Sequence, residues 1–260
     1  MAQIIVNNVQ KVFKTPGKDV IALKDINLDI KAGEFVCLLG PSGCGKSTLL
    51  NAVAGFALPS AGEITVEGKR ITGPGPDRGM VFQEYALFPW MTVAQNIAFG
   101  LEIQKKDKAE IDLTVNQLLD LLHLNDFRDR FPKDLSGGMR QRVAIARVLA
   151  LDSPIMLMDE PFGALDALTR RNLQDELLRI WEKLGKTILF VTHSIEEAII
   201  VGSRILVLTP HHGQVRAELN TNGLGAAEAD GEAFQALQRR IHTMLFAQRV
   251  EEEEKVKAHV

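Results

Sequence analysis

The sequence has few cysteines, no excess of positive charge and no long apolar run. Its two cysteines, Cys37 and Cys44, are too few for a disulfide scaffold, and a reducing compartment such as the cytosol fits them. The net charge of −3 and the pI of about 6.1 give no electrostatic case for nucleic-acid binding. No signal peptide is recognised, and no stretch approaches the roughly 20 apolar residues that cross a bilayer. A role at a membrane would therefore require a partner.

One glycine-rich stretch fits the phosphate-loop pattern G-x-x-x-x-G-K-[ST] without a mismatch. Residues 35–39 before it predict a buried strand, and residues 48–54 after it predict a helix that ends at Gly55. The alternative is an ordinary glycine-rich turn that happens to contain Lys-Ser, and such a turn does not require a strand before it and a helix after it. Backbone N–H groups of such a loop close around phosphates, while the lysine reaches the β- and γ-phosphates and the serine hydroxyl binds Mg²⁺. The predicted nucleotide-binding residues are Gly40, Pro41, Ser42, Gly43, Cys44, Gly45, Lys46, Ser47 and Thr48.

The order of predicted elements indicates an α/β fold. Hairpin signals over residues 4–36 predict antiparallel strands, and strand–helix alternation from residue 154 to 208 predicts a mainly parallel sheet with helices on both faces. Residues 209–227 look like loop, and an amphipathic helix follows. We expect four parts: 1–91, the start of the core with an antiparallel β subdomain and the phosphate loop; 92–150, an α-helical subdomain; 151–210, the rest of the core; and 211–260, a helical extension.

Polar residues follow three further predicted strands. Gln83 comes after residues 80–82, Asp159 and Glu160 after residues 155–158, and His193 just after residues 187–191. Each alone is weak, since such residues commonly belong to a polar loop, a helix start or a structural histidine. Ligands of doubly wound sheets bind beyond the carboxyl ends of the strands, so together they predict a nucleotide-hydrolysis site. The predicted catalytic residues are Lys46, Gln83, Glu160 and His193, and the predicted metal ligands are Ser47, Gln83 and Asp159.

Ser136, Gly137 and Gly138 lie outside that set, at the start of a predicted helix. By themselves they are a helix cap or a second anion-binding surface. In the segment 135–141, however, they resemble the signature motif of ATP-binding cassette (ABC) ATPases. Gln83 is similar to that family's Q-loop glutamine, residues 164–166 to its D-loop and His193 to its switch histidine.

The resemblance covers about residues 4–208 and implies the ABC ATPase fold: a P-loop NTPase core with an antiparallel β subdomain and an α-helical insertion. It implies ATP and Mg²⁺ as ligands and a head-to-tail homodimer with two ATP molecules at its interface. Each ATP would lie between the Walker motifs of one subunit and Ser136, Gly137 and Gly138 of the other. Phe13 by itself is a candidate core residue, and the resemblance casts it as the residue that stacks on adenine.

A finer resemblance rests on residues 83–90 and Met139, which are similar to the nitrate/sulfonate/taurine-type importer ATPases. It implies the ATP-hydrolysing subunit of a bacterial importer of a small oxyanion, at the cytoplasmic face of the inner membrane. Its partners would be a separate membrane permease and a periplasmic or external solute-binding protein. Residues 85–90 would lie near the groove for the permease's cytoplasmic coupling helix, although they could also simply pack the helical insertion.

Three alternatives remain. An exporter ATPase often has a fused membrane domain, and no membrane span is recognised here. A non-transport ABC ATPase of the chromosome type would carry a long coiled coil between Ser47 and Ser136, and one of the translation type would carry two cassettes. A phosphate-binding module that never hydrolyses ATP would not need Glu160 and His193.

Overall fold

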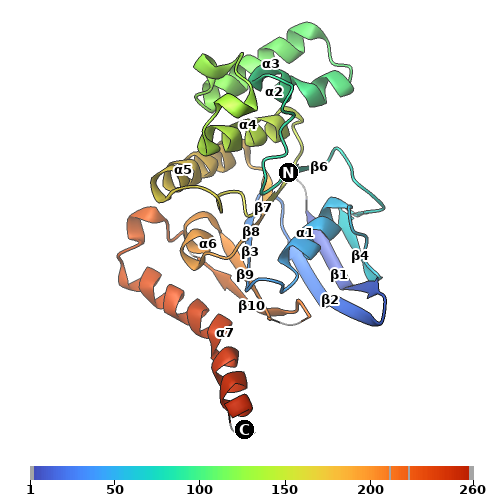
Figure 1. Ribbon diagram of the computed structural model, residues 1–260, viewed down its shortest axis with the longest axis vertical. Coiled ribbons are helices and arrows are strands. Elements are labelled where there is room, and N and C mark those ends of the chain that lie inside the picture. The colour runs from blue at the N-terminus through green and yellow to red at the C-terminus, as the bar shows by residue number, and fades with distance from the viewer. Residues whose placement is uncertain (1–2, 211, 222, 258–260) are drawn as a thin grey trace. The chain divides into compact units, whose positions relative to one another are not determined.

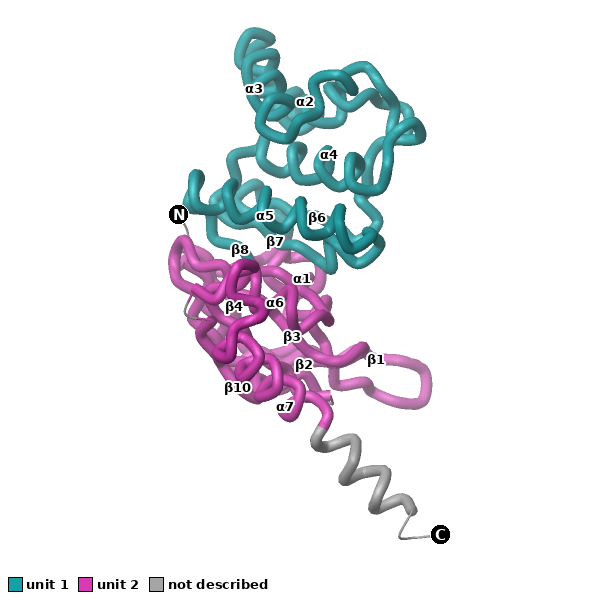
Figure 2. Tube along the Cα trace, turned by 90° about the vertical axis from the view of Figure 1, so that its left-hand side faces the viewer, with its two compact units in different colours: residues 1, 74–188 teal, residues 2–73, 189–260 magenta. Residues whose placement is uncertain are grey.

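The computed structural model describes residues 3–210, 212–221 and 223–257, and the chain forms two compact units (Figure 1, Figure 2). Of the residues drawn in colour in Figure 2, those of unit 1 (teal) lie within residues 74–188, and those of unit 2 (magenta) lie within residues 2–73 and 189–260. Unit 1 is thus one continuous stretch, and unit 2 is assembled from the stretches that flank it. None of the helices in the described ranges has the length and apolarity to cross a bilayer.

Unit 2 contains an antiparallel sheet in the order β2-β1-β4-β5. Its strands are β1 (Ile4–Thr15), β2 (Lys18–Ile30), β4 (Ala61–Val66) and β5 (Lys69–Arg70). Strands β1 and β2 turn at Pro16 and Gly17, where Gly17 has a φ of 92° that suits glycine. One face is apolar and buried, with Ile4 opposite Ile30. The predicted antiparallel β subdomain is confirmed.

Unit 2 also contains a second set of neighbouring strands, in the order β10 (Val215–Asn220), β9, β3 and β8 (Thr187–Thr192). Strand β3 (Phe35–Leu39) is buried along its whole length and runs parallel to β9 (Arg204–Leu208). The Ser203 hydroxyl accepts a hydrogen bond from the Phe35 N–H at 3.1 Å and donates one to the Phe35 carbonyl at 3.0 Å. The other elements of this unit are α1 (Lys46–Ala54), α6 (Ile195–Val201), η3 (Ala226–Glu228) and α7 (Glu232–Lys257).

The loop predicted over residues 209–227 is wrong for part of its length. Residues 215–220 form strand β10 (Val215–Asn220), which pairs antiparallel with β9. Val215, Ala217 and Leu219 alternate with polar residues, a period-2 pattern that fits an edge strand with one face toward the core. Neighbouring glycines and the modest apolarity of Ala217 hid this pattern.

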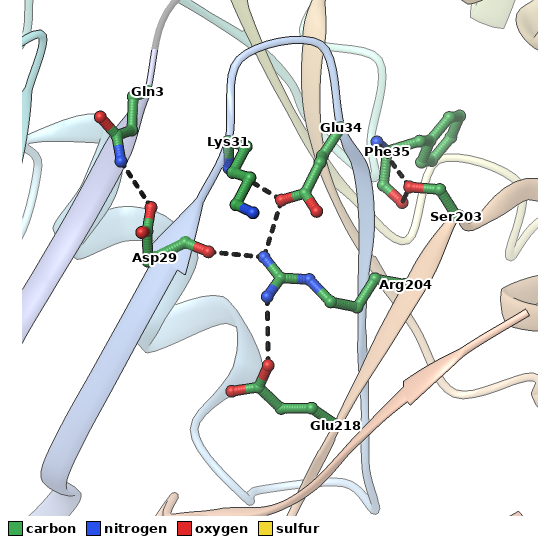
Figure 3. A network of polar contacts seen from close by, with 8 residues as sticks. All are labelled: Gln3, Asp29, Lys31, Glu34, Phe35, Ser203, Arg204 and Glu218. Atoms are coloured by element: carbon green, nitrogen blue, oxygen red, sulfur yellow. Dashed lines mark hydrogen bonds and ion pairs between the residues drawn. The ribbon is translucent and has the colours of Figure 1, made fainter.

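Arg204 connects the two sheets of unit 2 (Figure 3). Its guanidinium donates to the Asp29 carbonyl at 2.6 Å and to the Glu34 carboxylate at 2.7 Å, at the end of β2 and in the turn before β3. It also pairs with Glu218 of β10 at 3.1 Å. The planar guanidinium suits such multiple recognition. The strand that leads into the phosphate loop is therefore anchored at its starting end.

Unit 1 contains the parallel strands β6 (Arg78–Val81) and β7 (Ile155–Asp159), and β7 also neighbours β8 (Thr187–Thr192), whose first two residues belong to this unit. The predicted helical insertion is present. Its helices are α2 (Val93–Ile103), α3 (Lys108–Leu121) and α4 (Gly137–Ala150), with the 3₁₀ turns η1 (Asn125–Phe127) and η2 (Pro132–Asp134). Helix α5 (Ala167–Leu184) follows β7.

Short polar residues begin most of these helices by accepting a hydrogen bond from a backbone N–H of the first turn. At α2, Thr92 and Gln95 form a reciprocal capping box. Four further helices are capped in this way, by Asp107 at α3, Ser136 at α4, Asp166 at α5 and Ser194 at α6. Two of these caps, Ser136 and Asp166, lie in the motifs that sequence reasoning selected.

Candidate active site

The phosphate loop links the buried strand β3 to helix α1 in unit 2. Gly43 and Gly45 have φ values of 78° and 99°, in the left-handed region, and Gly45 immediately precedes α1. A Cβ on Gly45 would lie 2.7 Å from the Ala22 carbonyl oxygen and 2.9 Å from a methyl group of Leu23. Only glycine fits this position, for its backbone and for its surroundings.

Lys46 begins helix α1 and is only 5% exposed. Its ammonium donates to the carbonyls of Gly40 at 2.8 Å and Pro41 at 3.0 Å, so the cation lies over the loop that precedes it. Ser42, Gly43 and Ser47 are exposed. A buried cation, exposed loop residues and a helix N-terminus free of acidic side chains together favour phosphate oxygens as ligands.

Cys44 is the least exposed side chain of the loop, at 1%. A Cβ on Gly40 would meet its Sγ at 2.6 Å, so the thiol packs against the start of the loop. Burial raises the pKa of the Cys44 thiol, and the nearby Lys46 charge only partly offsets this. Both Cys44 and Cys37 are free thiols, as predicted.

His193 and Phe13 also belong to unit 2. His193 directly follows β8 and is exposed, and the next residue caps helix α6. Phe13 of β1 is 41% exposed, and the Lys11 ammonium lies 5.2 Å from its ring centroid while donating to the Leu58 carbonyl at 2.6 Å. An exposed ring beside a fixed cation offers a surface on which a planar ring can stack.

The acidic pair predicted after β7 is in unit 1. Residues 155–158 are buried, Asp159 ends the strand, and both Asp159 and Glu160 are half-buried. Glu160 has a φ of 44°, uncommon for a residue with a side chain. Its carbonyl accepts a hydrogen bond from the Gly163 N–H at 3.1 Å, which closes a turn. Such strained backbone often occurs at functional sites.

Gln83, which follows β6, lies near this turn. A Cβ on Gly163 would be 3.9 Å from both the Gln83 Nε2 and the Glu160 Oε2, so both side chains reach the same small residue. Strand β6 is parallel to β7, which explains why the residues after both strands meet. Within unit 1, the side chains of Gln83 and Glu160 therefore border the same glycine.

The signature segment begins helix α4 in the same unit. The Ser136 hydroxyl accepts from the Met139 N–H at 3.3 Å. A Cβ on Gly138 would meet Thr169 at 2.5 Å, and one on Gly137 would meet Leu165 at 3.2 Å and the Tyr85 hydroxyl at 3.3 Å. The first turns of α4 and α5 thus approach so closely that glycine is needed at position 138.

Each unit therefore carries one part of the predicted site. The phosphate loop, Phe13 and His193 belong to unit 2, while Gln83, Asp159, Glu160 and Ser136 belong to unit 1. The donors predicted for a metal are a hydroxyl, an amide and a carboxylate, which match the oxygen preference of Mg²⁺. Across the described ranges, no three His, Cys, Asp or Glu side chains group as a metal cage.

A family model described as "ABC transporter" matches residues 23–163. Over 219 residues the chain is 52% identical to the taurine import ATP-binding protein TauB of Roseobacter denitrificans, which covers 84% of this chain and 82% of that protein. This chain belongs to the ABC transporter family. It is also 48% identical over 223 residues to the nitrate import ATP-binding protein NrtD of Synechocystis sp., covering 86% of this chain and 84% of that protein.

The ABC fold is also found by structure. The dimeric post-hydrolysis structure of the ATP-binding cassette MJ0796, bound to ADP and Pi, is 36% identical to this chain with a TM-score of 0.75. The match covers 85% of this chain and 99% of that one. The predicted ABC ATPase fold and the predicted class of activity, ATP hydrolysis coupled to transport, are confirmed. The roles of individual site residues stay predictions.

One contact of the segment that follows Gln83 could not be predicted from the sequence. Arg147 of α4 donates to the carbonyl of Ala86 at 2.6 Å and to that of Tyr85 at 3.4 Å. The arginine and Ala86 are 61 positions apart, so no local pattern relates them. The left-handed backbone of Tyr85 and Ala86, neither of which is glycine, carries no sequence signature either.

Proposed function

We propose that this chain is the ATP-hydrolysing subunit of a bacterial ABC importer for a small oxyanion such as taurine, another sulfonate or nitrate. The relatives support this directly, because the proteins 52% and 48% identical to it are named as taurine and nitrate import ATP-binding proteins. The reaction is the hydrolysis of ATP to ADP and phosphate, which would energise uptake of the solute.

The observation that carries the chemistry is the acidic pair at the end of β7 with an amide beside it. In this proposal Glu160 orients the attacking water and accepts its proton, and Gln83, within reach of the same Gly163, contributes an amide to that water. A half-buried carboxylate is less hydrated than an exposed one, so its orientation is better defined.

The phosphate side of the reaction needs positive charge and hydrogen-bond donors. The N–H groups of the loop and the Lys46 ammonium would hold the β- and γ-phosphates, and His193 would donate a hydrogen bond to the γ-phosphate. Lys46 would exchange its carbonyl partners Gly40 and Pro41 for phosphate oxygens. Mg²⁺, held by Ser47, Gln83 and Asp159, would supply neutralising charge to the phosphates.

The active form in this proposal is a head-to-tail homodimer. Ser136, Gly137 and Gly138 would face the ATP of the second subunit with the N-terminus of α4, whose first turn has no acidic residue. Phe13 would stack on the adenine. The dimeric state of the MJ0796 cassette supports this arrangement.

The permease is proposed to dock on an aromatic surface of unit 1 formed by Phe88, Trp90 and Phe99. Phe88 lies 4.5 Å from Phe99 and 5.7 Å from Trp90 between ring centroids, and Trp90 is 69% exposed. The buried Asn96 fixes this loop, since its side chain bonds both backbone groups of Phe88 and the carbonyl of Met91. An exposed tryptophan beside two half-buried aromatic rings is typical of interfaces.

The remaining partners follow from the importer proposal. A permease would place this subunit at the cytoplasmic face of the inner membrane, and a periplasmic or external solute-binding protein would select the solute. No residue of this chain needs to contact the solute.

The test is the ATPase rate of the subunit assembled with the permease encoded beside it and with the solute-binding protein. Taurine, other sulfonates and nitrate would be added one at a time, with Glu160→Gln as the inactive control. Stimulation by one solute is expected and would identify the cargo. A steady rate that ignores every solute in an intact complex would contradict the importer proposal and favour an exporter or a non-transport role.

A further inference from the structure

The segment that follows Gln83 has an unusual backbone. Tyr85 and Ala86 have φ values of 61° and 49°, two consecutive left-handed residues without a glycine. Such a conformation crowds the Cβ of each residue and persists only where surrounding contacts hold it. Within the segment, the Ala86 N–H donates to the Glu84 carbonyl at 2.6 Å, and the Tyr85 N–H donates to the Phe82 carbonyl at 3.2 Å.

Arg147 supplies contacts from outside the segment. Its two terminal nitrogens donate to consecutive carbonyls, Ala86 at 2.6 Å and Tyr85 at 3.4 Å, and its guanidinium lies 5.4 Å from the Phe88 ring centroid. None of the ion pairs in the described part of the chain involves Arg147. A partly buried cation whose partners are two carbonyls and a ring depends on the shape of that turn.

A second arginine of helix α4, Arg140, contacts the same turn through the side chain of Tyr85. Arg140 lies 5.4 Å from the Tyr85 ring centroid, and the Tyr85 hydroxyl is 3.3 Å from the position of a Cβ on Gly137. Arg140 and Arg147 are seven residues apart and so share one face of α4. The turn after Gln83 is therefore tied to the helix that begins with the signature motif.

We propose that Arg147 is a positioning residue for hydrolysis: it holds the left-handed Tyr85–Ala86 turn and thereby keeps the Gln83 side chain beside Gly163, the glycine that Glu160 also borders. The inference rests on the proposed roles of Gln83 and Glu160 but not on the identity of the permease or the solute. Without Arg147 the turn relaxes toward right-handed backbone and Gln83 leaves its place. ATP binding is little affected, because the contacts of Lys46 lie within the phosphate loop itself.

The test measures kcat and KM for ATP with the purified subunit, comparing wild type, Arg147→Lys and Arg147→Met. Lysine keeps the positive charge but lacks the planar guanidinium that bonds two carbonyls at once. The lysine variant therefore still tests the inference if the methionine variant does not fold. A drop in kcat of about ten- to a hundredfold is expected, with KM for ATP within about twofold of wild type. A folded pair of variants with wild-type kcat, or with raised KM and unchanged kcat, would overturn the inference.

Rescue separates positioning from general stability. Glycine adopts left-handed backbone without strain, so Ala86→Gly should restore kcat severalfold in the Arg147→Met background. The matched control is Arg142→Met on the same helix, which removes the 3.0 Å ion pair with Glu176 and leaves the turn untouched. Equal rescue of both backgrounds by Ala86→Gly would reject the positioning role. A failure of Glu160→Gln to slow hydrolysis would instead reject the proposed chemistry.

Discussion

Glu160 combines a left-handed backbone with a half-buried carboxylate directly after β7. Replacing it with glutamine keeps the size of the side chain and removes its ability to accept a proton. We expect Glu160→Gln to slow phosphate release by about a hundredfold or more, while ATP binding persists and traps the dimer. Colorimetric phosphate release and light scattering with ATP would measure the two effects.

The matched control for this variant is Glu182→Gln, because Glu182 is an exposed residue of α5 outside the predicted site. It should hydrolyse ATP at the wild-type rate. If Glu160→Gln hydrolysed as fast as this control, Glu160 would lose the role of general base.

Cys44 predicts a pH dependence of chemical modification. The thiolate is the form that reacts with iodoacetamide, and burial raises the pKa of this thiol, so less thiolate is present at neutral pH than for an ordinary cysteine. Alkylation should therefore be slow near neutral pH and should keep rising at pH values where an exposed thiol has already levelled off. Bound ATP should slow it further by covering the loop.

The measurement is mass spectrometry of Cys44 labelling in a Cys37→Ala background, from about pH 7 to about pH 9.5, with glutathione as the reference thiol. Labelling that levels off at or below the pH of glutathione would contradict the effect of burial. Equal labelling with and without ATP would show that the nucleotide does not cover the loop.

The roles of residues could be predicted from the sequence where those roles depend on neighbours in sequence. Lys46 and Ser47 follow from a local pattern between a strand and a helix, and the structure places them there. The partnership of Arg147 with Ala86 could not be predicted, because it depends on how α4 packs beside the turn after β6. Tertiary packing, and not local propensity, also selected the backbone of Tyr85 and Glu160.

At the scale of elements, the phosphate loop contains two left-handed glycines, Gly43 and Gly45, whose alanine variants can be compared. A Cβ on Gly43 would meet nothing within 4 Å, whereas one on Gly45 would clash with the Ala22 carbonyl. Gly43→Ala should cost about 1–2 kcal/mol of unfolding free energy, from backbone strain alone. Gly45→Ala should cost more, because its clash with β2 adds to a similar strain.

Urea unfolding of both variants would measure the difference in unfolding free energy. Equal losses of unfolding free energy in the two variants would mean that β2 adjusts to the added methyl group at no cost in free energy. The contact of Gly45 with β2 would then not constrain the loop.

Elements with strong periodicity were predicted well. Strand β3 is a continuous apolar run and α1 ends at Gly55, whose φ of 85° makes it a left-handed cap. Strand β10 was missed because its apolar face contains only Val215, Ala217 and Leu219, which is a weak signal in a glycine-rich region. Its position depends on pairing with β9, which a local pattern does not report.

At the scale of the whole molecule, the permease should recognise the aromatic surface of Phe88, Trp90 and Phe99. Trp90→Ala removes the most exposed of these rings, so the subunit should lose most of its co-purification with the permease. Leu113→Ala is the control, since Leu113 is 59% exposed on α3 and outside this surface. Thermal unfolding would verify that both variants fold.

If the Trp90→Ala subunit co-purified with the permease as well as wild type does, the permease would bind elsewhere on the subunit. Equal loss with Leu113→Ala would indicate a broader interface that includes α3.

One of the two neighbours of β3 in its sheet, β9, is synthesised late. Phe35 and Ser203, which are joined by two hydrogen bonds, are 168 positions apart. At a translation rate of roughly 5–20 residues per second, the ribosome needs about 10–30 s to make the intervening chain. During that time β3, all of whose residues are buried in the folded protein, lacks this partner strand. The nascent chain thus has a long window in which chaperones or a sister chain could capture this strand.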